Sequence, residues 1–129
     1  MIVNKFIEQL NKETLYEKTF KVGSLPNEGK IMEGLEEAII TFDDNNFIVY
    51  VFEGIFKPIY SKKYQFLFKD IKNIEIGKYN FKDRYLKLFF DEEKHLVFTY
   101  LLKQRKYEKQ ALYVNEFLDV LYKISKEED

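Results

Sequence analysis

The sequence predicts an α+β domain, mainly antiparallel β, in which six or seven strands precede one C-terminal α-helix. Short segments of alternating polarity carry most of the 13 Phe and 10 Tyr residues, and aromatic residues favour sheet. Short connections between these segments require neighbouring strands to run antiparallel. A long amphipathic segment without Pro or Gly follows them. With 129 residues, 46% of them hydrophobic, residues 1–129 are expected to form one domain with a single substantial core.

The first 13 residues are predicted to form a short helix. Ile2, Val3, Phe6, Ile7 and Leu10 recur at helical spacing, and the other face mixes positive and negative charges. A helix that lies on a membrane surface usually carries a strongly cationic face, so a role in packing against the domain is preferred. Its length makes it marginal alone, so packing must stabilise it.

The segment from residue 15 to residue 103 is predicted to be a series of antiparallel strands. The expected strands are Leu15–Val22, Ala38–Phe42, Phe47–Glu53, Ile59–Phe68, one that ends near Gly77, Arg84–Phe90 and His95–Leu102. Asp43–Asn46 and Asp91–Lys94 are hairpin turns in this reading, and Gly23–Gly29 is a connecting loop.

The C-terminal helix is expected to span residues 105–126. Its apolar stripe comprises Ala111, Val114, Phe117, Leu118, Leu121 and Ile124, whereas Glu108, Gln110, Glu116, Asp119 and Lys123 fall mainly on the other side. Each large apolar side chain removed from water contributes roughly 1.5–3 kcal/mol, so the stripe requires a hydrophobic partner. We expect this helix to close one end of a curled sheet or barrel.

Several of these segments resemble bacterial pleckstrin-homology-like (PH-like) domains. Phe68–Ile76 fits the pattern (F/L)-x-D-I-x-x-I-E, and Arg84–Phe90, His95–Tyr100 and the helix follow in the order of that family. The hairpin of Ala38–Phe42 and Phe47–Tyr50 is also similar, so the resemblance covers about residues 15–124. It implies a curled sheet or barrel capped by the C-terminal helix, and a non-catalytic binding module, sometimes for anionic lipid head groups and often for proteins.

Three features depart from that family. The C-terminal helix has no Trp, and the N-terminal helix is an addition. Lipid-binding members carry clustered basic residues in the first strand–strand loop. Here Lys21 and Lys30 only flank Gly23–Gly29, and Glu28 lies inside it. These departures weaken the expectation of phosphoinositide binding.

The net charge of −1 conceals an asymmetry along the chain. Residues 1–53 contain 5 Lys and 10 Asp or Glu, whereas residues 57–87 contain nine Lys or Arg and three Asp or Glu. This pattern predicts a dipolar surface, unless it only reflects Lys-rich codon usage. The candidate residues for binding an anionic surface are Lys57, Lys62, Lys63, Lys69 and Lys72. Nucleic-acid binding is not expected, because the chain is acidic overall and contains only two Arg.

No set of residues suggests catalysis. His95 is the only His, and it follows the acidic pair Glu92–Glu93, but a lone His at the start of a strand is usually an ordinary edge residue. The paired carboxylates lie in predicted turns, which lack the apolar walls that tune a catalytic pKa. We therefore expect no enzymatic activity, cofactor, metal or small-molecule substrate.

The sequence leaves three hypotheses of function. The absence of Cys, of a secretory signal and of long apolar runs favours a soluble, cytoplasmic protein. The preferred hypothesis is a module that binds a protein partner or its own copies through a sheet edge or loop surface. The second is peripheral binding to anionic membranes through the basic segment Lys57–Lys87, which contains the five lysines named above. The third is a small inhibitor or immunity-type protein that uses acidic residues, namely Glu33, Glu36, Glu37, Asp43 and Asp44.

Overall fold

The structure is a computed structural model that describes residues 3–24, 37–54 and 56–127. Its elements are α1 (Val3–Gln9), β1 (Lys18–Ser24), β2 (Glu37–Phe42), β3 (Asn46–Glu53), β4 (Ile59–Leu67), the 3-10 helix η1 (Phe68–Asp70), β5 (Asn73–Lys78), β6 (Arg84–Phe89), β7 (His95–Tyr100) and α2 (Gln110–Glu127). The mainly antiparallel fold with a C-terminal helix, expected from the sequence, is confirmed.

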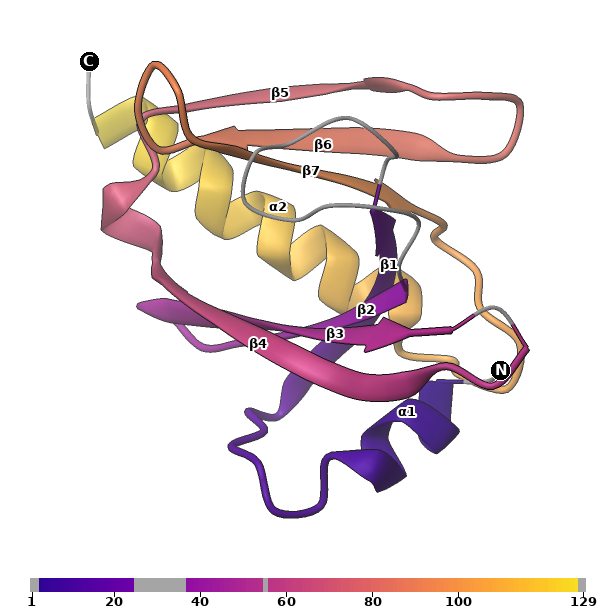
Figure 1. Ribbon diagram of the computed structural model, residues 1–129. Helices are drawn as coiled ribbons and strands as arrows, with labels where there is room; N and C mark the ends of the chain where they lie inside the picture. The colour runs from indigo at the N-terminus through magenta and orange to yellow at the C-terminus, as the bar shows by residue number, and fades with distance from the viewer. Residues whose placement is uncertain (1–2, 25–36, 55, 128–129) are drawn as a thin grey trace.

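The seven strands form one open sheet in the order β4-β3-β2-β1-β7-β6-β5, and every pairing is antiparallel. β1 joins the two halves of this sheet. It pairs with β2 from Lys18 to Gly23 but with β7 only at Gly23 and Ser24. The halves therefore diverge beyond this short junction and face each other as two layers, with α2 between them (Figure 1). Strands β4 and β5 are the two edges of the sheet.

The main core lies between the two layers and includes the apolar face of α2. Val114, Phe117 and Leu121 of the predicted stripe are 1–2% exposed, and Ala111, Leu118 and Ile124 are half-buried. The Phe117 ring lies 5.1 Å from the rings of Phe20 and Phe42 and 5.4 Å from those of Phe47 and Phe68. These edge-to-face and tilted pairs join α2 to strands of the first layer and to η1.

A second hydrophobic cluster lies on the outer face of β2 and β3, under α1. Val3, Phe6 and Leu10 are at most 1% exposed and pack in a cluster with Ile39, Ile48, Tyr50 and Phe52. The Phe6 and Phe52 rings are 4.5 Å apart. Alternation along β2 and β3 sends one set of side chains to each cluster, which explains why these strands are buried on both faces.

Two element boundaries differ from the sequence expectation for identifiable reasons. β1 begins at Lys18, not Leu15, because the backbone of Tyr16 bonds to a side chain: its N–H donates to Thr41 Oγ1 at 2.8 Å. α2 begins at Gln110 rather than 105, because a bridge between Gln104 and Tyr107 and the positive φ of Lys106 (57°) form a turn. The N-terminal helix α1 ends at Gln9, before the predicted residue 13, in a tighter turn where the Leu10 N–H donates to the Ile7 carbonyl.

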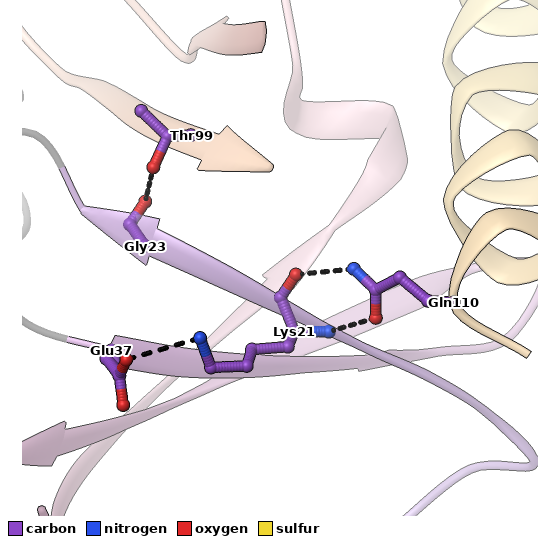
Figure 2. A network of polar contacts seen from close by, with 5 residues as sticks. All are labelled: Lys21, Gly23, Glu37, Thr99 and Gln110. Atoms are coloured by element: carbon purple, nitrogen blue, oxygen red, sulfur yellow. Dashed lines mark hydrogen bonds and ion pairs between the residues drawn. The ribbon is translucent and has the colours of Figure 1, made fainter. Parts of the chain in front are cut away.

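Gln110 fixes the start of α2 to the sheet (Figure 2). Its side-chain amide donates to the carbonyls of Lys21 (2.8 Å) and Leu101 (3.0 Å), and its Oε1 accepts from the Lys21 N–H (2.9 Å). Lys21 Nζ in turn lies 3.2 Å from Glu37 Oε1. Gln110 is only 1% exposed, although its place in the helical pattern assigned it to the polar face.

Candidate functional site

Several connections lie on one side of the folded molecule (Figure 1), here called the loop end. In the first layer these are residues 54 and 56–58, between β3 and β4, and in the second layer residues 78–84, at the β5–β6 turn. Residues 101–109, between β7 and α2, run down the same side of the molecule (Figure 1). Together these three segments define the loop end.

The loop end is strongly cationic and the opposite side of the molecule, here called the opposite end, is acidic (Figure 1). The three segments of the loop end contain eight Lys or Arg against Asp83 and Glu108, a net charge of +6. The opposite end comprises residues 43–45, 68–72 and 90–94, which contain three Lys against six Asp or Glu, a net charge of −3. The described part of the chain is therefore polarised between these two sides, and the loop end favours an anionic partner.

A pocket of about 480 Å³ opens at the loop end. It is lined by Lys82, Arg84, Tyr100, Leu101, Leu102 and Lys103. Arg84 and Tyr100 are direct cross-strand neighbours. Burial raises the pKa of Tyr100, the charge of Arg84 lowers it by a smaller amount, and the neighbouring Tyr122 adds to the rise. Three cations around a phenol and an apolar floor are suited to a phosphate or carboxylate group.

The loop end also exposes large hydrophobic side chains. Among the described residues eight such side chains are exposed. Four of them, Phe56, Tyr79, Phe81 and Leu102, lie here, and Ile59 adjoins this end as the first residue of β4. Phe81 is 99% exposed and Phe56 is 95% exposed, so neither ring contributes to the core. Single exposed apolar residues are normal, but a group on one face marks an interaction surface.

The β5–β6 turn holds Phe81 outward by a set of local hydrogen bonds. Asn80 Oδ1 accepts from the N–H groups of Lys82 (2.9 Å) and Asp83 (2.7 Å), and its amide donates to Asp83 Oδ2 (3.0 Å). The N–H groups of Tyr79 and Asn80 donate to the Asp83 carbonyl. An Asn side chain that closes its own turn in this way fixes the backbone on both sides of Phe81.

The loop that carries Phe56 is held at its base by α1. The Gln9 amide donates to the Pro58 carbonyl at 3.0 Å, and Gln9 Oε1 accepts from the Tyr60 N–H at 2.8 Å. Gly54 has φ +122°, a conformation that a side chain would strain. The additional N-terminal helix therefore positions a loop of the candidate surface.

The five lysines predicted from the sequence do not gather at one place. Lys57 lies at the loop end, whereas Lys69 and Lys72 lie at the opposite end, beyond the nine residues of β4. Lys62 and Lys63 are adjacent on β4, so their side chains point to opposite faces of the sheet. Lys62 Nζ is 3.7 Å from Glu53 Oε1, and Lys63 Nζ is 3.2 Å from Glu13 Oε2. Only Lys57 therefore shares a surface with the pocket and the exposed rings.

The cations that do gather come from distant segments. Lys82 lies in the β5–β6 turn, Arg84 begins β6, and Lys103 follows β7. Lys82 and Arg84 belong to the basic segment of residues 57–87 but were not singled out within it, and Lys103 lies outside that segment. One signal was available: Phe81 stands between the turn-forming residues Asn80 and Asp83, where an aromatic side chain has no core to enter.

The residues considered for catalysis lie away from the pocket. His95 begins β7 at the opposite end, is half-buried, and packs its ring 5.8 Å from that of Phe89. Asp91 Oδ1 accepts from the N–H groups of Glu93 and Lys94, so it closes the β6–β7 turn. Among the residues that the structure describes, no three His, Asp or Glu side chains form a group able to hold a metal ion.

The acidic residues of the inhibitor hypothesis are split between regions. Glu37 lies at the start of β2 and pairs with Lys21, whereas Asp43 and Asp44 form the β2–β3 turn at the opposite end. Burial would raise the pKa of Asp43, but hydrogen bonds from the backbone of Asn45 and Asn46 outweigh it and lower the pKa. Glu33, Glu36 and residues 25–29 of the predicted loop lie outside the described residues.

Comparison with known proteins supports the fold and leaves the function open. No protein-family model matches the chain, and no curated protein matches its sequence. In the described part of the chain, none of the helices has the length and apolar character needed to cross a bilayer.

One solved structure is similar: the hSac2 domain from human phosphoinositide phosphatase Sac2. The TM-score is 0.56 at 9% sequence identity, and the match covers 100% of this chain and 86% of that one. At this identity the likeness concerns the arrangement of strands and helices alone.

Proposed function

We propose that this chain is a non-catalytic binding module with a PH-like fold, which docks on anionic membranes through the loop end. The PH-like assignment draws on the strand order, on the C-terminal helix between the layers and on the family pattern in Phe68–Ile76. A domain from a phosphoinositide phosphatase has a similar arrangement of strands and helices. This likeness assigns no role to any residue of the present chain.

The observation that carries this proposal is the charge polarity of the described residues. Each Lys or Arg close to an anionic bilayer contributes about 1 kcal/mol of attraction, and the effect decays within a Debye length of ~10 Å at 0.1 M salt. The loop end, with a net charge of +6, would therefore be attracted to the anionic surface. The opposite end, with a net charge of −3, would be repelled from it. The two effects together orient the protein with the pocket toward the lipid head groups.

Flotation with phosphatidylcholine vesicles, with and without phosphatidylserine, tests this proposal at low and high salt. We expect binding only to the anionic vesicles, weakened by salt. The double variant Lys82→Glu/Lys103→Glu should lower the partition coefficient at least about tenfold, since two attractive charges become repulsive. The matched control is Lys69→Glu/Lys72→Glu at the opposite end, which should bind nearly as the wild type does. Equal losses in both variants, or no flotation of the wild type at low salt, would contradict the proposal.

The non-catalytic part of the proposal has its own test. His95 lies at the opposite end of the sheet from the pocket, with an aromatic ring as its neighbour. A turnover screen on phosphate and carboxylate esters should therefore find no activity. Activity that disappears in the His95→Ala variant would overturn this part while leaving membrane binding intact.

A second candidate, self-association through a sheet edge, has one observation in its favour. β4 and β5 are both edges, and an edge presents unpaired backbone groups to another strand. β4 carries Lys62 and Lys63 and a register shift opposite Val51 and Phe52, features that hinder pairing, so β5 is the more open edge. Sedimentation velocity over a wide concentration range tests this candidate, and a strict monomer would reject it.

A further inference from the structure

We infer that Phe56 and Phe81 are two hydrophobic anchors that insert between the head groups of an anionic bilayer. This inference rests on the proposed function and adds a mechanism to it: the charges bring the protein to the surface, and the two rings enter it. Phe81 and Phe56 are 99% and 95% exposed, which are the highest values among the large hydrophobic side chains of the described residues.

The exposure of Phe81 belongs to the folded turn itself. Asn80 and Asp83 bond to each other and to the backbone on both sides of Phe81, which leaves the ring at the tip with no part in the turn's bonding. The loop of Phe56 is likewise held at Pro58 and Tyr60 by Gln9. A side chain presented by a fixed backbone loses little further conformational freedom on binding, which favours affinity.

The chemistry around each ring matches the interface of an anionic bilayer. Lys57 follows Phe56 and Lys82 follows Phe81 in the sequence, and both lysines are exposed. A Lys beside an inserted apolar side chain keeps its ammonium among the lipid phosphates while the ring goes deeper. Ile59, Tyr79 and Leu102, also exposed at or beside the loop end, add apolar surface around the two anchors.

The location of the two rings on separate loops favours a membrane over a protein groove. β3 and β6 belong to different layers and are four inter-strand steps apart in the sheet, a path of about 19 Å along it at ~4.8 Å per step. A bilayer accepts two separate apolar tips with cations around them at any spacing. A protein partner would need two separate pockets with acidic residues beside both.

The chain lacks Trp, so single Trp substitutions report insertion directly. Phe56→Trp and Phe81→Trp replace nearly fully exposed rings, and the fold should therefore accept both. Leu67→Trp is the matched control, because Leu67 is 37% exposed and lies at the end of β4 beside η1, away from the loop end. The probe is a vesicle of phosphatidylcholine and phosphatidylserine, with part of the phosphatidylcholine brominated on its acyl chains to quench inserted Trp.

We expect blue-shifted emission and quenching for Phe56→Trp and Phe81→Trp on these vesicles, and neither effect for Leu67→Trp. Vesicle binding with unchanged emission at both positions would overturn the inference but leave the proposed electrostatic docking standing. Quenching of Leu67→Trp to the same extent would also overturn it, because the orientation would be wrong. If none of the proteins floats with the vesicles, the inference and the proposed function fail together.

Serine variants separate the two contributions to binding. Phe56→Ser and Phe81→Ser should each lower the partition coefficient about tenfold, a partial loss for a ring that is only partly buried in the interface. This loss should persist at high salt, whereas the effect of Lys82→Glu/Lys103→Glu should fade with salt. Unchanged partitioning of both serine variants, with circular dichroism like that of the wild type, would reject the anchors.

Discussion

Gln110 shows how much a single polar side chain contributes to this fold. Its amide satisfies three backbone groups in a buried position, two of them on Lys21 in β1 and one on Leu101 after β7. Through these bonds the start of α2 is tied to the strand that joins the two halves of the sheet (Figure 2). Buried backbone groups that lose their partners are expensive to leave unpaired.

The Gln110→Ala variant should therefore lose about 2–4 kcal/mol of unfolding free energy, since three partly buried backbone groups lose their partner. Gln110→Glu should be at least as damaging, because a carboxylate cannot donate to the two carbonyls and would be buried. Urea denaturation measures both changes. Gln65→Ala, an exposed Gln on β4, is the control and should stay within about 0.5 kcal/mol of the wild type.

Tyr50 links stability to pH. Its hydroxyl donates to the Thr14 carbonyl at 2.5 Å, and the residue is fully buried. Burial, with a smaller contribution from the charge of Glu13, raises the pKa of Tyr50 from 10.0 to about 12. The folded state thus keeps a proton that the unfolded chain releases above pH 10.

This shift predicts a loss of stability in alkali. Below pH 10 both states hold the proton, so Tyr50 adds no pH dependence, and between pH 10 and 12 stability falls by up to about 1.4 kcal/mol per pH unit. Denaturant titrations across this range should show a smaller slope for Tyr50→Phe than for the wild type. The slope should not vanish, because burial also raises the pKa of Tyr107 to about 12. Equal slopes would mean that the phenol is solvated in the folded protein.

At the scale of the element, α2 is stabilised by its position between the two layers. Its stripe supplies Phe117, whose ring meets rings from β1, β2, β3 and η1. Its outer side exposes Leu112 and Tyr122, which are 47% and 48% exposed. The helix is thus held by one face only, as an amphipathic helix at a domain boundary is.

Phe117→Ala should cost about 3–5 kcal/mol, the range for removing a large buried aromatic side chain and leaving a cavity. Leu112→Ala on the same helix should cost less than about 1 kcal/mol, because its side chain is half in water. Thermal or urea denaturation distinguishes the two. Similar costs for both variants would show that α2 does not sit between the sheet layers.

At the scale of the whole molecule, two hydrophobic clusters share the strands β2 and β3. The cluster around α2 uses one face of these strands, and the cluster under α1 uses the other. If β2 and β3 separate, both clusters lose the strand faces against which their other side chains pack. The two clusters should therefore unfold in one step.

Urea unfolding followed by far-ultraviolet circular dichroism and by Tyr fluorescence should give coincident curves with a single midpoint. Removal of a ring from the smaller cluster, as in Phe6→Ala, should shift both curves together to lower urea. Two separate midpoints, with one moved by Phe6→Ala and the other by Phe117→Ala, would contradict a single cooperative unit.

The sequence by itself determined the elements and their order. Hydrophobic alternation and the long amphipathic segment predicted the antiparallel strands and the C-terminal helix, and they identified Val114, Phe117 and Leu121 as core, because side-chain periodicity is a local property of the chain. The sequence did not reveal that Gln110 is buried and bonds to the sheet, because this depends on which backbone groups a distant strand leaves unpaired.

Only the tertiary structure decided which charges and rings share a surface. The lysines clustered in the sequence are dispersed, because a strand places neighbours on opposite faces and separates its two ends by its length. Lys82, Arg84 and Lys103 meet around one pocket because antiparallel pairing brings the start of β6 beside the end of β7. The physical reason is that proximity along the chain sets periodicity, whereas proximity in space is set by strand pairing across long sequence separations.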